Sequence, residues 1–188
     1  MSTPQLLLER YVEAKDLTRP QLMPDIYAPD AILTFSIATD SIDFPRRVAG
    51  RDAITRTLVV DFAARFSRCK TFYVCESPPR ETAHPVVLPW LVLMREGALD
   101  QLRIGKGYYR WMFEKRGDGT ARVTAMHIHI AAMEAIADAD GHLLAAAQAP
   151  LTYPWLAPAM MRSKLGELAK ADPALTFLRG FLSPVDAR

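Results

Sequence analysis

Two spacings of apolar residues divide the chain, helical at first and alternating from about residue 69. Thr3 and Pro4 are suited to begin a helix, because threonine caps helix ends and proline fits the first turn. The apolar stripe behind them has helical spacing: Leu7, Leu8, Tyr11, Val12 and Ala14. A short helical segment after residue 20 and a third helix from about residue 50 are expected next. The third helix repeats an apolar residue every four positions: Ile54, Leu58, Phe62 and Phe66.

Alternating positions predict the strands. One strand is expected at 31–37, and four more at 69–76, 88–95, 102–115 and 121–133. Helices followed by a meander of long strands indicate an α+β fold, with helices on one face of a curved, mostly antiparallel sheet. We divide the chain into a domain at 1–137 and a C-terminal helical extension at 138–188, because the aromatic and proline-rich extension differs in character.

Composition excludes several classes of protein. The net charge is only +2 and no block of lysine or arginine stands out, so a nucleic-acid partner is not expected. No apolar run reaches the ~18 residues of a membrane span, and the first residues lack the pattern of an export signal, so we expect a cytoplasmic protein and no membrane partner. Cys69 and Cys75 lie about 20 Å apart if their segment is a strand, which predicts free thiols.

Three short motifs in the first 60 residues carry a resemblance to a known family. They are Arg10-Tyr-Val-Glu-Ala, Ile26-Tyr-Ala-Pro-Asp-Ala-Ile and Gly50-Arg-Asp-Ala-Ile. Their order and spacing resemble the nuclear transport factor 2-like superfamily, within it the ketosteroid isomerase and SnoaL-like polyketide cyclase branches, over residues 5–133. The resemblance implies a cone, in which the sheet wraps around the N-terminal helices and an apolar pocket opens at one end.

The resemblance also implies candidate catalytic residues. Tyr11 matches the oxyanion-donating tyrosine of ketosteroid isomerase, and Tyr109 falls near its second donor. The position of the base is Phe35, which cannot accept a proton, and this argues against that enzyme's mechanism. Tyr11 is equally consistent with a core tyrosine that is bonded to the backbone.

Strand parity adds an expected pocket. Tyr109, Trp111 and Phe113 share one face of their strand, and the resemblance turns that face inward. A pocket for a flat apolar ligand is then expected, and its other predicted lining residues are Leu33, Phe35, Met126, Ile128 and, from the extension, Trp155. The alternative is that these residues fill the core and leave no cavity.

Polar residues give further candidates. His127 and His129 share a strand face, and with Glu134 their spacing resembles a cupin metal motif, but no second such motif follows and helices precede the strand. We therefore predict no metal and no cofactor, and place the histidines on a structural or dimer face, or in catalysis if they reach the pocket. Asp40 follows the first strand and could act as a base if its loop folds inward; otherwise it is a solvated turn residue.

Two functions from different classes remain open. The first is binding of a small apolar molecule of polyketide, steroid or aromatic type, with acid–base chemistry as an isomerase, cyclase or dehydratase. The second is a non-catalytic ligand-binding or dimerisation module. A homodimer is expected through the outer sheet face. The apolar extension is expected to dock on the cone mouth or on the partner, and we favour the mouth, with Trp155 or the Met160-Met161 turn closing over the ligand.

Overall fold

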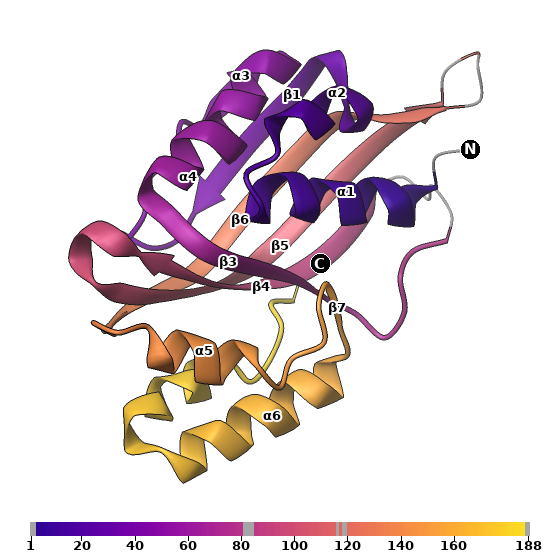
Figure 1. Ribbon diagram of the computed structural model, residues 1–188. Helices are drawn as coiled ribbons and strands as arrows, with labels where there is room; N and C mark the ends of the chain where they lie inside the picture. Colours follow the sequence, from indigo (N-terminus) through magenta and orange to yellow (C-terminus); the bar gives the residue numbers. More distant parts are fainter. Residues whose placement is uncertain (1–2, 81–84, 116, 118–119, 187–188) are drawn as a thin grey trace.

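A computed structural model describes residues 3–80, 85–115, 117 and 120–186. Within them, one mixed sheet has the strand order β2-β1-β6-β5-β4-β3-β7 (Figure 1). The strands are β1 Tyr27–Ile37, β2 Arg47–Ala49, β3 Phe66–Val74, β4 Val86–Glu96, β5 Gln101–Lys115, β6 Ala121–Ala137 and β7 Trp155–Leu156. Neighbours are antiparallel except β1 with β6 and β3 with β7. The predicted α+β fold with a mostly antiparallel sheet is confirmed.

The N-terminal helices lie together on one face of this sheet (Figure 1). They are α1 Pro4–Asp16, η1 Pro20–Leu22, α2 Met23–Ile26, α3 Arg51–Thr55, η2 Arg56–Val60 and α4 Asp61–Arg65. Thr3 caps α1 as expected, since its hydroxyl oxygen accepts from the Leu6 N–H at 3.2 Å. Gly50 precedes α3 with φ 87°, which favours glycine. Phe66, expected at the end of the third helix, instead begins β3.

The inner face of the sheet and these helices share one apolar core. Alternate residues of β5 and β6 point into it, including Trp111 and Met126, while the residues between them face outward. Cys69 is buried at its edge, and both cysteines are free thiols. No helix among the described residues is long and apolar enough to cross a membrane.

The C-terminal extension covers the outer face of the sheet, not the cone mouth that we favoured. Its elements are α5 His142–Gln148, β7, α6 Pro158–Ala171 and η4 Pro173–Phe181, and Figure 1 shows α5 and α6 across the sheet from α1. A second apolar core joins them to β3, β4 and β5: it includes Phe72, Leu91, Leu93, Leu102 and Ile104 from the strands and Leu144, Leu165 and Phe181 from the extension. The extension covers this face because the side chains of β4 are apolar on both faces of the sheet, and each face needs a covering layer.

Candidate functional site

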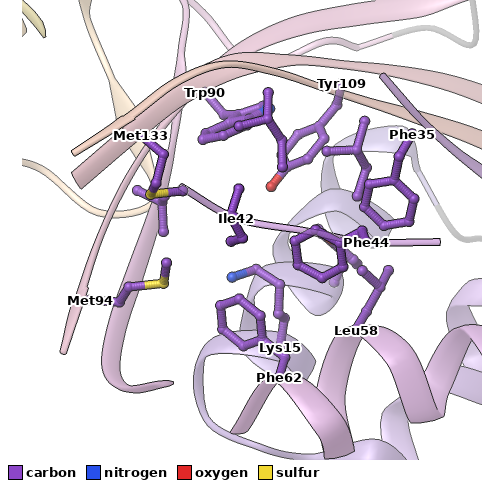
Figure 2. Close-up of a pocket in the computed structure, with 14 residues that line it drawn as sticks. Lys15, Phe35, Ile42, Phe44, Leu58, Phe62, Trp90, Met94, Tyr109 and Met133 are labelled. Carbon is purple, nitrogen blue, oxygen red and sulfur yellow. The ribbon is translucent and has the colours of Figure 1, made fainter. Parts of the chain in front are cut away.

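A small cavity lies inside the cone, between the inner sheet face and the N-terminal helices (Figure 2). Its volume is about 50 Å³. The walls are mainly apolar and come from α1, η2, α4, four strands and the loop at 38–46. The lining residues are Tyr11, Lys15, Phe35, Ile42, Phe44, Leu58, Phe62, Trp90, Val92, Met94, Tyr109, Ile128, Ile130 and Met133.

Lys15 is the charged residue of this lining, at the last turn of α1. Its side chain is only 6% exposed, and its Nζ lies 2.8 Å from Asp16 Oδ1. Nζ also donates to Cys69 Sγ at 3.4 Å and stands 4.4 Å from the centroid of the Phe62 ring. An ammonium group has three N–H donors, so two are used and one remains for the cavity. Figure 2 shows the nitrogen directed into that space.

Asp16 forms an ion pair with this lysine, and its side chain is almost fully buried, at 1% exposed. Its Oδ1 accepts from the Cys69 thiol at 3.2 Å and the Thr71 hydroxyl at 2.9 Å. Its Oδ2 accepts from the Thr71 N–H at 2.6 Å and the Tyr153 hydroxyl at 3.1 Å. A buried carboxylate needs such partners, and here they come from α1, β3 and the extension.

This arrangement fixes the protonation of the cluster. Burial by itself lowers the pKa of Lys15, but the adjacent Asp16 carboxylate outweighs it, so the pKa is raised above the usual value for lysine. Burial and Asp16 together raise the pKa of Cys69 to about 12. At neutral pH the lysine is therefore a cation, and the cysteine is a neutral thiol rather than a nucleophilic thiolate.

Three neutral donors accompany the lysine. The Tyr11 hydroxyl and Trp90 Nε1 are buried and have no hydrogen-bond partner among the described residues. The hydroxyl of Tyr109 points into the cavity in Figure 2, and its ring meets that of Tyr11 edge to face at 5.9 Å. Burial raises the pKa of both tyrosines, so both keep their protons. Donors without acceptors are costly in a core, which makes this wall suited to a ligand that supplies an acceptor.

The loop at 38–46 closes the cavity. Ile42 is buried, and Phe44 stacks on Phe35 with ring centroids 4.7 Å apart and nearly parallel planes. Ser41 anchors the loop, since its hydroxyl donates to the Met133 carbonyl oxygen at 2.8 Å and its own carbonyl oxygen accepts from Arg103 at 3.0 Å. Ligand pockets usually measure about 300–1,000 Å³, so a ligand larger than a few atoms has to displace Ile42 or Phe44.

Comparison with known proteins identifies the fold of the chain. No protein-family model and no curated protein sequence matches the chain. Among solved structures, a nuclear transport factor 2-like superfamily protein from Salmonella enterica aligns at a TM-score of 0.53 and 16% identity, over 67% of this chain and 87% of that one. The chain has the nuclear transport factor 2-like fold.

Two further solved structures align with the chain. LinA aligns at a TM-score of 0.56 and 16% identity, over 70% of this chain and 85% of that one. The hexachlorocyclohexane dehydrochlorinase LinA-type3 from Novosphingobium barchaimii aligns at 0.53 and 15% identity, over 70% of this chain and 86% of that one. At these identities the likeness shows the nuclear transport factor 2-like fold alone.

The predicted pocket residues separate into three groups within this fold. Tyr11, Phe35, Tyr109 and Ile128 line the cavity. The others, Leu33, Trp111, Phe113 and Met126, are buried in the core beside it and do not line it. Trp155 lies outside, stacked on Tyr73 with ring centroids 4.9 Å apart. In the second group, the Tyr11 ring packs on Trp111 with ring centroids 4.9 Å apart, and the Tyr27 hydroxyl lies 2.9 Å from Met126 Sδ; strand parity cannot reveal such neighbours.

The polar candidates lie away from the cavity. Asp40 is exposed in the loop after β1, as a turn residue. His127 and His129 are on the outer face, where the Ser36 hydroxyl bridges them at 2.9 and 2.7 Å and Thr34 bonds His127 at 2.8 Å. Asp138, Asp140 and His142 bring potential ligand atoms within 4.8 Å of one another. The Asp138 carboxylate, however, accepts from the N–H groups of Leu143 and Leu144 at the start of α5.

His127 is expected to titrate below the ordinary histidine value of 6.5. Burial lowers its pKa first, and the charges of His129 and Arg110 lower it further. The unfolded chain then binds this proton more tightly, so the contribution of His127 to folding is lost as the pH falls below 6.5. NMR titration of the imidazole checks this, and Arg110→Met should raise the pKa. Titration at or above 6.5 in the wild type contradicts the expectation.

Sequence reasoning missed Lys15, Asp16, Trp90, Ile42 and Phe44. A signal for Lys15 was present, because it follows Tyr11 by four residues and thus lies on the buried face of α1. Ile42 and Phe44 are apolar residues in an otherwise polar loop, which is typical of a segment that folds inward. Nothing local distinguishes Asp16 from an ordinary residue at a helix end.

Proposed function

We propose that the cone pocket binds a small apolar molecule that carries a carbonyl or similar oxygen, and assists acid–base chemistry beside that oxygen. One observation carries the proposal: the cationic Lys15 opens into an apolar cavity next to the Tyr11 and Tyr109 hydroxyls. A titratable group within reach of the cavity favours an enzyme over a passive binder. An isomerase, cyclase or dehydratase is the class of reaction that fits.

The charge balance of the site supports a neutral substrate. Lys15 and Asp16 together carry no net charge, so an anionic ligand would add an uncompensated charge to an apolar space. A neutral carbonyl oxygen can instead accept the free N–H of Lys15 and a tyrosine O–H. When a water molecule takes up a neighbouring C–H proton, the electron pair left behind places negative charge on that oxygen, and preorganised donors stabilise it. Among the described residues, the lining holds donors but no carboxylate or imidazole, so its own contribution is electrostatic stabilisation.

A pair of isosteric probes tests this proposal. Acetophenone and α-methylstyrene have nearly the same shape, but only the ketone has an acceptor oxygen. Removal of one donor by Tyr109→Phe should reduce the ratio of ketone to alkene affinity by about tenfold, because one hydrogen bond to the ligand is lost. Isothermal titration calorimetry measures both affinities. Phe44→Ala, which enlarges the cavity, should strengthen the binding of both probes alike.

The controls separate binding from stability. Tyr108→Phe removes a hydroxyl from the neighbouring position of β5, which faces outward, and should leave the ratio unchanged. An equal ratio in wild-type protein and Tyr109→Phe would exclude the carbonyl-binding role of this wall. Deuterium uptake into the methyl group of acetophenone from heavy water reports the acid–base step independently of affinity.

A non-catalytic module is the second candidate, and the uncovered part of the outer face favours it. Met112 is 39% exposed there, next to Arg110, and the extension leaves this end of β5 and β6 open. We propose that two copies pair through this face as a homodimer, because an open sheet face with apolar groups favours association. Light scattering that gives a monomer mass at micromolar concentration would contradict pairing.

A further inference from the structure

Tyr153 connects the C-terminal extension to the ion pair behind the cavity. Its hydroxyl donates to Asp16 Oδ2 at 3.1 Å, although 137 residues separate the two in sequence. The side chain of Asp16 is 1% exposed, whereas Tyr153 as a whole residue is 38% exposed. The tyrosine therefore stands between a buried carboxylate and solvent. A shallow groove between α1 and the extension, lined by Glu9, Glu13 and Tyr153 among others, runs along this side.

The segment around Tyr153 is held firmly in this place. The Tyr73 N–H donates to the Pro154 carbonyl oxygen at 2.8 Å, and the Cys75 N–H donates to the Leu156 carbonyl oxygen at 3.1 Å. The Trp155 indole N–H donates to Glu9 Oε1 at 2.8 Å, about two helical turns before Asp16 on α1. Backbone pairing with β3 and two side-chain bonds to α1 thus fix the tyrosine.

We propose that Tyr153 is a positioning residue, which seals the Asp16–Lys15 pair from water and so keeps the free N–H of Lys15 directed into the cavity. Asp16 has its other donors on β3 and α1, and only Tyr153 among the described residues closes its solvent side with a hydrogen bond. Without that bond the carboxylate can turn toward water, and the ammonium group follows it. The C-terminal extension then completes the site from outside the cone. This inference deepens the proposed function, since it concerns the same lysine.

Hydrogen exchange of the Lys15 ammonium group tests the seal without any ligand. Nitrogen-15 NMR of the full chain measures how fast its protons exchange with water, and Lys15→Met identifies the signal. Tyr153→Phe keeps the ring but removes the donor, and should accelerate exchange by roughly tenfold, the lower end for a bond to a charged group. Tyr153→Ala also removes the cover and should accelerate it further.

Trp155→Phe is the matched control. It removes the other side-chain bond of the same segment to α1, keeps a ring stacked on Tyr73, and leaves the Tyr153 hydroxyl that bonds Asp16 unchanged. Its exchange rate should equal that of the wild type, even if both substitutions lower the melting temperature equally. Equal exchange in the wild type, Tyr153→Phe and Tyr153→Ala overturns the proposal, as does equal acceleration by Trp155→Phe. Because this experiment uses no ligand, its result does not depend on whether the protein binds the ketone.

Discussion

A chain that ends at Ala137 is expected to aggregate instead of forming a soluble cone. Removal of the extension uncovers five large apolar side chains of β3, β4 and β5, each at most 1% exposed in the full chain: Phe72, Leu91, Leu93, Leu102 and Ile104. Burial of each contributes about 1.5–3 kcal/mol. Their sum, roughly 10 kcal/mol, equals the whole stability of an ordinary domain. We therefore propose that the predicted boundary between residues 137 and 138 separates two layers of one folding unit rather than two independent domains.

A single substitution tests the same layer without deleting it. Leu165 of α6 is fully buried against the outer sheet face, and Leu165→Ala should cost about 2–5 kcal/mol in the free energy of unfolding. Leu99→Ala is the matched control, because Leu99 is 56% exposed and a surface change usually stays within about 0.5 kcal/mol. Urea denaturation measures both. A truncated chain that remains monomeric and folded would show that the cone does not need its outer layer.

The sequence predicted the presence of this layer better than its place. The apolar stripe of α6 indicated burial, and its residues Met161 and Leu165 are buried while Leu168 is partly buried. The favoured place was wrong because the decisive signal lies in β4, where Val86 to Met94 is apolar at nearly every position. An unbroken apolar strand indicates cover on both faces, whereas alternation indicates one. The helices of the cone supply one cover, and the extension must supply the other.

Strand parity predicted the facing of side chains but not the shape of the cavity. It turned Tyr109 inward and His127 outward, as observed, because the pairing of β5 with β6 is regular around these residues and the register shifts lie on either side of them. It could not distinguish Phe35, which lines the cavity, from Leu33, which does not, because that depends on the helices opposite. Asp16 was invisible for a similar reason, since its partners Thr71 and Tyr153 are 55 and 137 residues away.

Lys15→Met should destabilise the protein by about 3–5 kcal/mol, because it leaves the buried Asp16 carboxylate without its counter-charge. The Thr71 and Tyr153 donors remain, but they carry no full charge. The pH dependence has a definite sign. Folding raises the pKa of Lys15 above 10.5, so its contribution is complete below that pH and declines only as the pH rises beyond it. The loss in Lys15→Met should therefore be the same at pH values near 7 and near 9.

The second member of the pair supplies the decisive comparison. In Lys15→Met with Asp16→Asn, no charge is left unpaired, and the amide oxygen can still accept from the Thr71 N–H. The double variant should therefore be more stable than Lys15→Met alone, with a coupling energy of about 1–3 kcal/mol in the cycle. Urea denaturation of the four proteins measures it, and Lys164→Met, at an exposed lysine of α6, is the control. Additive losses would show that Lys15 and Asp16 act independently. Because a buried lysine without an electrostatic partner would not stay charged in this apolar cavity, that result would also contradict the cationic Lys15 of the proposed site.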